Sequence, residues 1–151
     1  MRPRALRSLG RSQNGATLVE FALVAPVFLA LLFGALEFGL ALWTQQALQE
    51  TAIAGARCMA LPQTNCATPP TYSYSSSNTT TYIQTVASQW GISLPSANIT
   101  QTNTGTTQCG ASGFSQVSLT FTFQSVVPNL VQIPSGGIPL SATACFPNNN
   151  P

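Results

Sequence analysis

The sequence predicts an α+β protein in which one long N-terminal transmembrane helix continues into the periplasm and a small antiparallel β-rich domain with one short helix follows. Three observations lead to this prediction. Residues 21–43 form an uninterrupted apolar run, a helical apolar pattern continues beyond it as far as Pro62, and apolar residues alternate with Ser and Thr near the C-terminus. A period of 3.6 indicates a helix, whereas a period of two indicates a half-buried strand.

The apolar run at 21–43 has the length of a membrane span, and Glu37 is its only charged residue. About 20 apolar residues are enough to cross the hydrocarbon core of a bilayer. The cations lie almost entirely before the run, and only Arg57 follows it. The positive-inside rule therefore places the N-terminus in the cytoplasm and the chain after Trp43 outside. The preceding cations are Arg2, Arg4, Arg7 and Arg11.

Two other readings of this run are weaker. A buried core helix of a soluble protein would need a second apolar helix to cover it, and the sequence offers none. A secretory signal cut near Ala41 would have a shorter apolar core, and a break in the helical pattern would follow it. Here the pattern runs on through Thr44 and Gln45 without a break.

The helix is expected to span about residues 16–60, because Pro62 ends the periodic pattern. Pro26 lies inside it and predicts a kink near Ala22, since proline removes one helical hydrogen bond. The predicted organisation is a cytoplasmic leader at 1–15, the transmembrane and extended helix at 16–61, a loop or linker at 62–81, and a small periplasmic α+β domain at 82–151.

The outer part contains one expected helix and two expected strands. Residues 67–81 are rich in Pro, Ser, Thr and Asn, which predicts a loop without packed elements. A short amphipathic helix is expected over 82–90, with Thr81 as its cap and Gly91 after its end. Strands are expected at 117–123 and 138–146, weaker ones near 97–103 and 125–133, and a turn at Gly136-Gly137.

All four cysteines follow the apolar run, on the side where an oxidising compartment lets thiols pair. Four cysteines permit three pairings, and the sequence alone does not choose among them. We favour Cys58 with Cys66 and Cys109 with Cys145, and free structural thiols are the alternative. The spacings lack the paired short intervals of zinc sites, so no metal site is expected.

The amino-acid composition argues against an enzymatic function. The chain has no His, Lys or Asp, and its only acids are Glu20, Glu37 and Glu50. Hydroxyl nucleophiles need a neighbouring base, and none is available beyond the first third of the chain. We therefore expect no catalytic residues, no cofactor and no enzyme activity. Nucleic acid is also not expected as a partner, because no cation follows Arg57.

The residues before the apolar run, Arg11-Ser12-Gln13-Asn14-Gly15 and then Ala16 to Phe21, resemble a type IV prepilin leader. The resemblance implies that a membrane-embedded prepilin peptidase cuts between Gly15 and Ala16, which makes Glu20 the fifth residue of the mature protein. A carboxylate about one turn from the new amine can neutralise a positive charge that a helix N-terminus disfavours. Within the family, this amine and acid are thought to pair between subunits. Without the neighbouring leader residues, Glu20 would be read as an ordinary acidic residue in the first turn of a helix.

Residues 15–60 are similar along their whole length to the TadE-like pilin family, through the VEFALV start, the Pro after it, the FGxxEFG segment and the AxxGAR exit. Beyond residue 60 the similarity to the family is only general, as in the LSATA segment at 140–144 near the C-terminus. The resemblance implies a minor pilin or pseudopilin of tight-adherence (Flp) pilus machinery in the bacterial inner membrane. Its implied partners are a prepilin peptidase, other pilin subunits, the assembly platform and the lipid bilayer. The uncharged outer domain and its four cysteines depart from the family pattern.

One stripe of the span combines small residues with its acid: Ala30, Gly34, Glu37 and Ala41. Small residues four apart let helices approach closely in lipid, and an ionised acid near mid-helix costs about 2.5 to 3.5 kcal/mol. We therefore expect a helix–helix contact with Glu37 as its polar point. Alternatively, Glu37 reaches interfacial water, since it lies about 9 Å from Trp43 along the helix.

The leading hypothesis is a non-enzymatic subunit for pilus assembly. The alternative is an uncleaved, signal-anchored binding or adhesion module outside the cytoplasm. The first residue of the mature protein distinguishes them: Ala16 indicates a pilin, and Met1 or Arg2 a signal anchor. Whether the subunit enters the fibre, and what its outer domain contacts, stay open.

Overall fold

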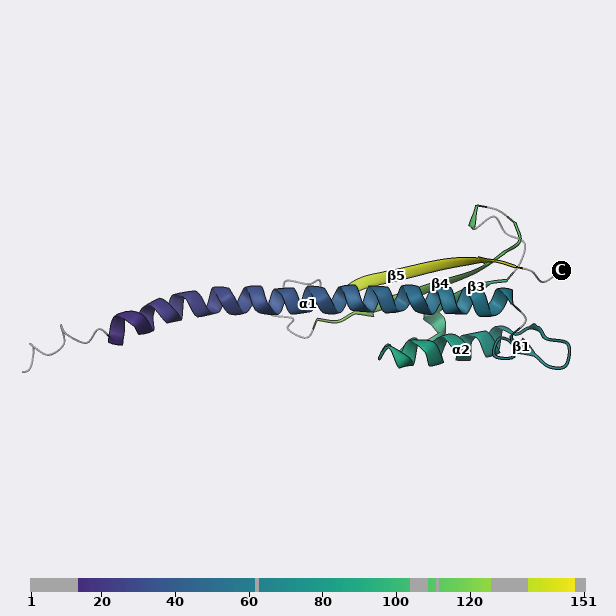
Figure 1. Cartoon of the computed structure of the whole chain (residues 1–151), viewed down its shortest axis with the longest axis horizontal. Coiled ribbons are helices and arrows are strands. Elements are labelled where there is room, and N and C mark those ends of the chain that lie inside the picture. Colours follow the sequence, from purple (N-terminus) through teal and green to yellow (C-terminus); the bar gives the residue numbers. More distant parts are fainter. Residues whose placement is uncertain (1–13, 62, 104–108, 111, 126–135, 149–151) are drawn as a thin grey trace, which may run out of the picture.

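One helix organises the whole protein. The computed structural model describes residues 14–61, 63–103, 109–110, 112–125 and 136–148. Helix α1, Asn14–Ala60, has 47 residues, which correspond to about 70 Å at 1.5 Å per residue. It runs along the full long axis of the molecule, and every other element lies beside its C-terminal part (Figure 1). The long helix expected over 16–60 is confirmed.

Helix α1 has two different halves. From Leu18 to Trp43 its large apolar side chains are exposed, whereas from Ala47 to Ala60 many of its side chains are buried. Pro26 lies inside the helix, and α1 curves over its N-terminal, purple part (Figure 1). Among the described residues, α1 alone is long and apolar enough to cross a membrane, and the mean hydropathy of its most apolar window is 2.3.

A three-stranded antiparallel sheet packs against the outer half of α1. Its strands are β3 (Ile99–Thr102), β4 (Phe114–Phe123) and β5 (Ile138–Pro147), in the order β3-β4-β5. In β4 and β5, alternate side chains face α1, and Val117 pairs with Ala144 while Leu119 pairs with Ala142. The two expected strands and their alternation are confirmed.

The weaker strand predictions have different outcomes. The one near 97–103 corresponds to β3, which a short 3₁₀ helix at Ser96–Asn98 precedes. The one near 125–133 falls almost wholly outside the described residues, and Ser125 itself is not in a strand. Gly137 has a φ of +80°, and a Cβ there would lie 2.6 Å from the Phe123 carbonyl oxygen. Only glycine avoids both problems, in agreement with the turn expected at this pair.

Helix α2, Ser76–Gln89, packs on another side of α1. It runs back along α1 toward the N-terminal half (Figure 1). At its C-terminal end, the Ile92 N–H donates to the Ala87 carbonyl and the Gly91 N–H to the Ser88 carbonyl. With Gly91 at a φ of +76°, this is a Schellman motif. The glycine after the helix therefore acts as expected.

The start of α2 corrects the sequence prediction. The helix begins at Ser76 rather than residue 82, and its cap is Ser75, whose hydroxyl accepts from the Asn78 N–H; Thr81 is interior. The Ser- and Thr-rich composition disfavours helix because these hydroxyls compete for backbone groups. Here that competition is harmless, since the hydroxyls donate to carbonyls four residues back. Thr79, Thr80, Thr81 and Thr85 all do so.

The predicted linker at 62–81 is also corrected, because it contains packed structure. Strands β1 (Ala67–Thr68) and β2 (Ser73–Tyr74) form a small antiparallel pair before α2. Asn78 ties this pair to α2 by donating from its amide to the Ala67 carbonyl, at 3.0 Å. A tertiary contact of this kind overrides the loop composition, so residues 67–81 form part of the outer domain.

The core lies where α1, α2 and the sheet meet. Gly55 is the closest approach: a Cβ at this position would lie 2.8 Å from Ile83 Cγ1 and 3.4 Å from Val117 Cγ2. The outer half of α1 is therefore the central element of the domain core. The buried apolar residues are Ala47, Leu48, Ala52, Ala56, Met59, Ile83, Ala87, Ile92, Leu94, Val117, Leu119, Ala142 and Ala144.

Candidate functional site

Glu37 is the buried acid of the molecule, with 7% of its surface exposed. The segment that follows β4 reaches it. Ser125, just after β4, donates from its hydroxyl to Glu37 Oε1 at 3.0 Å. A carboxylate removed from water requires such donors, because an unsatisfied buried charge is costly. Glu37 thus has a hydrogen-bond partner within its own chain.

The face of α1 that carries Glu37 is the face that packs against the outer domain. Moving outward from Glu37 in steps of three or four, the next side chains on this face are half-buried and then fully buried. Steps of three and four keep residues on one side of a helix. Glu37 therefore marks the inner end of the intramolecular interface. The residues along this face are Glu37, Ala41, Thr44, Leu48, Thr51, Gly55 and Met59.

This arrangement divides the small-residue stripe expected to contact another helix. Ala30 is exposed and Gly34 is half-buried, so the inner part of the stripe is open to a neighbour. The helix–helix contact stays a prediction for all four residues, and the structure adds that Glu37 and Ala41 also face the outer domain of their own chain. For Glu37, the sequence pattern did not reveal the contact from Ser125, because 88 residues separate the two.

The expected processing residues lie at the start of α1. Gly15, Ala16 and Glu20 are all exposed, and a Cβ at Gly15 would meet nothing within 4 Å. Ala16 and Glu20 are four residues apart in a continuous helix, which puts them on one face about 6 Å apart along the axis. This geometry suits a carboxylate that neutralises an amine at Ala16. The leader residues 1–13 lie outside the described part of the chain.

The four cysteines form two disulfides, Cys58–Cys66 and Cys109–Cys145. These are the two pairs that the sequence analysis favoured. Cys58–Cys66 joins the end of α1 to the segment before β1, and the Cys66 carbonyl accepts from the Ser75 N–H that leads into α2. Cys109–Cys145 joins the segment before β4 to β5. Both staple the domain at the end distant from Glu37.

Sequence reasoning missed the pairing of the two tryptophans. Trp43 of α1 and Trp90 at the C-terminal end of α2 meet edge to face, with ring centroids 5.7 Å apart and an interplanar angle of 65°. Both stay substantially exposed, at 59% and 39%. The usable signal was one Trp at the end of the apolar run and another at the end of the expected short helix. Trp90 lies at the edge of the core.

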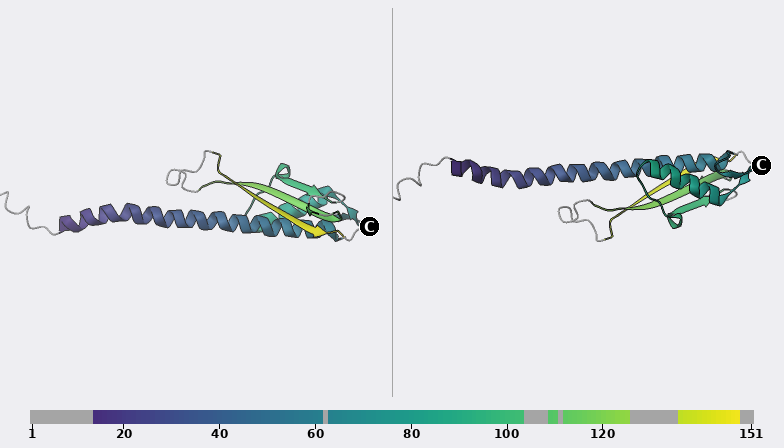
Figure 2. Two further views of the ribbon diagram at one scale, coloured as in Figure 1. Left: turned by 90° about the horizontal axis from the view of Figure 1, so that it is seen from above. Right: turned by 90° about the horizontal axis from the view of Figure 1, so that it is seen from below.

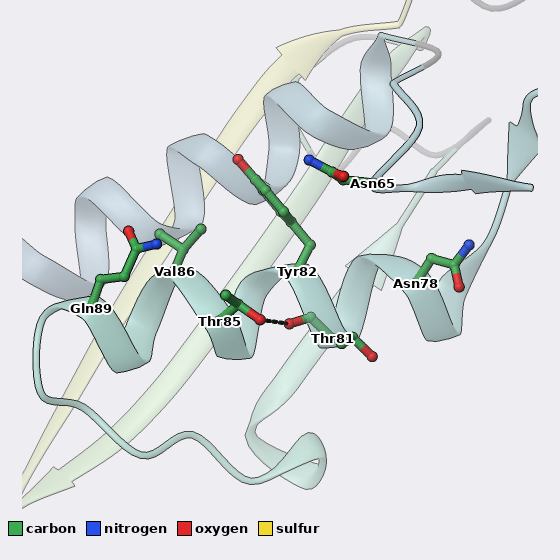
Figure 3. Close-up of a pocket in the computed structure, with 7 residues that line it drawn as sticks. All are labelled: Asn65, Asn78, Thr81, Tyr82, Thr85, Val86 and Gln89. Atoms are coloured by element: carbon green, nitrogen blue, oxygen red, sulfur yellow. Dashed lines mark hydrogen bonds between the residues drawn. The ribbon is translucent and has the colours of Figure 1, made fainter.

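One hollow lies along α2 and has a volume of about 520 Å³. Figure 3 shows Tyr82 pointing from α2 toward α1, with Asn65 beside it. Three of its polar side chains already donate to backbone carbonyls: Asn78 to Ala67, Thr81 to Ser77 and Thr85 to Thr81. No charged side chain lines it. Its other polar side chains are Asn65, Tyr82 and Gln89, so the hollow is polar but uncharged.

The Glu37–Ser125 contact predicts a measurable coupling. We expect Glu37→Gln and Ser125→Ala to lose less stability together than the sum of their separate losses, by about 1 kcal/mol or more, because hydrogen bonds to charged groups are strong. Chemical unfolding of the four proteins in detergent micelles would measure this. Glu50→Gln is the matched control, since Glu50 is exposed on the same helix and accepts from Gln46. Additive losses for Glu37 and Ser125 would contradict the contact.

Comparison with known proteins adds one finding to this geometry. Residues 15–57 match the family model of TadE-like proteins. No curated protein and no solved structure matches the chain. The matched residues cover the exposed apolar length of α1, Glu37 and most of the helical turns that carry the core. The resemblance seen in the sequence is thus confirmed over this range, and residues 15–57 are a TadE-like segment.

Proposed function

We propose that this chain is a non-enzymatic TadE-like minor pilin or pseudopilin, anchored in the bacterial inner membrane as a subunit for assembly of a Tad/Flp-type pilus. The observation that carries the proposal is the TadE-like match at 15–57, which coincides with a helix that is apolar and exposed in one half and central to a folded domain in the other. A TadE-like segment suggests a component related to the Tad pilus, and the helix supplies the means of anchoring it.

In this proposal, the span ends near Leu36 and not at Trp43. Ser125 is irregular in backbone conformation and contacts Glu37, and lipid-exposed irregular backbone does not occur within the hydrocarbon core. Twenty residues from Thr17 to Leu36 reach about 30 Å, which is the thickness of that core. The four Arg before residue 12 favour a cytoplasmic N-terminus. Ala16 then lies at the cytoplasmic boundary, where a membrane-embedded peptidase acts.

The packing of the outer domain on α1 also leaves one side of the helix exposed for contacts with other subunits. The outer domain packs on only part of the circumference of α1, so Glu50, Ile53 and Arg57 stay exposed on the remaining side. No charged residue follows Arg57 in the sequence, so contacts of the outer domain are largely apolar and hydrogen-bonded and respond little to salt. The proposed role therefore depends on processing, helix packing and surface contacts, with no reaction at an active site.

Processing provides the direct test. When the full chain is produced together with a Tad-type prepilin peptidase, we expect N-terminal sequencing to give Ala16 as the first residue. Gly15→Leu should abolish the cleavage, because a side chain occupies the position before the cut bond. Gly39→Ala is the matched control: this glycine lies in the same helix and a Cβ there meets nothing within 4 Å. It should be cleaved normally.

The outcomes separate the proposed role from its rivals. An intact start at Met1 or Arg2 in the presence of active peptidase would show a signal anchor and overturn the pilin role. A start near Leu42 would show ordinary secretion and overturn the membrane anchor as well. If cleavage occurs at Ala16, Glu20→Gln should still be cleaved but should reduce co-purification of other pilin subunits, since it removes the charge that faces the new amine.

A further inference from the structure

The paired tryptophans lie where the apolar surface of α1 ends. Trp43 continues a row of exposed apolar side chains that includes Leu36 and Leu40, spaced at three and four residues on one side of the helix. The row leads directly from the proposed span to the Trp43–Trp90 pair. The pair is thus continuous with the lipid-facing surface, although Trp90 belongs to a different helix of the outer domain.

The height of the pair above the bilayer follows from the Glu37–Ser125 contact. With the hydrocarbon boundary at Leu36, Trp43 lies about 10 Å further out along α1, and the headgroup layer is about 5 to 7 Å thick on each side. Side chains on a helix lean toward its N-terminus, so the Trp43 indole reaches back toward the bilayer. The Trp90 ring centroid is 5.7 Å from that of Trp43. The Trp43 backbone is thus just beyond the headgroup layer, its ring reaches back toward the headgroups, and the Trp90 ring lies beside it.

The rest of the domain has the orientation that such a contact requires. Helix α2 runs back along α1 so that its C-terminal end, where Trp90 lies, faces the N-terminal half of α1, while the β1–β2 pair lies at the opposite end (Figures 1 and 2). Indole combines an apolar ring with one N–H donor, and tryptophan is enriched at membrane interfaces for this reason. The exposure of both rings leaves them available to lipid.

We propose that Trp43 and Trp90 dock the outer domain onto the outer headgroup layer of the bilayer. This inference rests on the proposed membrane anchoring. The lipid surface is the favoured occupant because the pair is continuous with the apolar surface of the span and lies next to the headgroup layer. Docking at two points on two helices fixes the tilt of the domain relative to the membrane. The subunit is then held in one orientation before it meets its neighbours.

Single-tryptophan variants test the inference, because the chain has only two Trp residues. Trp43→Phe leaves Trp90 as the reporter, and Trp90→Phe leaves Trp43. The full chain would be reconstituted in phosphatidylcholine vesicles carrying a spin label on the headgroup or at mid-chain, with iodide as the aqueous quencher. We expect the headgroup label to quench Trp90 about twofold more strongly than the mid-chain label, as for interfacial tryptophans.

A matched control places the reporter at the other end of the domain. Tyr72 is 45% exposed and lies between β1 and β2, so Tyr72→Trp in the Trp43→Phe, Trp90→Phe background should respond to iodide and not to lipid labels. Circular dichroism of each variant would check that the fold is retained.

Each other outcome overturns the inference in a distinguishable way. Quenching of Trp43 by lipid labels together with quenching of Trp90 by iodide alone would remove the docking and keep the membrane anchor. Lack of lipid quenching at both tryptophans would also overturn the docking, and flotation of the full chain with the vesicles would show separately whether the membrane anchor holds. Protection of Trp90 from every quencher would show that protein covers it, and stronger quenching by the mid-chain label would place it too deep for a headgroup contact.

Discussion

Replacing Cys109 and Cys145 by Ser should be the most damaging of the side-chain changes considered for the outer domain. The bond closes a loop with a sequence separation of 36, and the chain-entropy estimate for such a loop is about 4 kcal/mol. It also links the segment before β4 to β5, which is the edge strand of the sheet that lies against α1. We therefore expect a loss of about 4 kcal/mol in the free energy of unfolding.

The second disulfide is the matched comparison. Cys58→Ser with Cys66→Ser opens a loop with a separation of only 8, so the same estimate gives about 2.5 kcal/mol. Denaturant titrations of both double variants in micelles, with the unreduced wild type as reference, would measure the two losses. Equal losses, or a larger loss for the shorter loop, would contradict the entropic explanation. Each double variant keeps one disulfide, so adding reductant should lower its free energy of unfolding only by the contribution of that remaining bond.

Gly55→Val should destabilise the outer domain by about 3 kcal/mol, because it overfills a packed core. The added Cβ alone would lie 2.8 Å from Ile83 Cγ1 and 2.9 Å from Ile83 Cδ1. Ile83 is fully buried and has little room to move aside. The substitution should push α2 away from α1, and thermal unfolding followed by circular dichroism would detect it as a lower melting temperature.

Two variants make the explanation specific. Gly39→Ala should leave the melting temperature unchanged or slightly raised, because its Cβ meets nothing and alanine favours helix. Ile83→Ala combined with Gly55→Val should be less destabilised than the sum of the single changes by more than about 1 kcal/mol, since the valine fills part of the space that isoleucine leaves. Purely additive losses would show that Gly55 matters through the helix backbone and not through packing.

The features that sequence predicted correctly are those with a local period. Helix α1 follows from an apolar run and a continued 3.6-residue rhythm, and β4 and β5 follow from strict alternation. The start of α2 was missed because its first turns consist of Ser, Thr and Asn, which favour loops in isolation. Thr79 is nevertheless fully buried, so packing decides the conformation where composition opposes it.

The residues of the candidate site could be predicted only where the pattern that identifies them lies within one short stretch of sequence. The leader and the acid at Glu20 are read from neighbouring residues, and their roles stay predictions. The partner of Glu37 depends on a contact with Ser125 across 88 residues, and nothing in the residues around Ser125 indicates an acid. For the same reason, the sequence of the span predicts a contact of Glu37 with another helix, which stays a prediction, and gives no sign of the contact with its own domain.

The continuity of α1 also has a mechanical meaning. The same helix spans from the apolar N-terminal half to the centre of the domain core without an interruption, so no hinge separates the two. A force that draws the subunit out of the lipid would pass along the helix axis straight into the folded domain. The β4 and β5 strands pack on α1 at a slant to its axis (Figure 2), so the load reaches the α1–sheet contact largely as shear. The outer domain would therefore feel such a force directly, through its packing on α1 and not through a flexible linker.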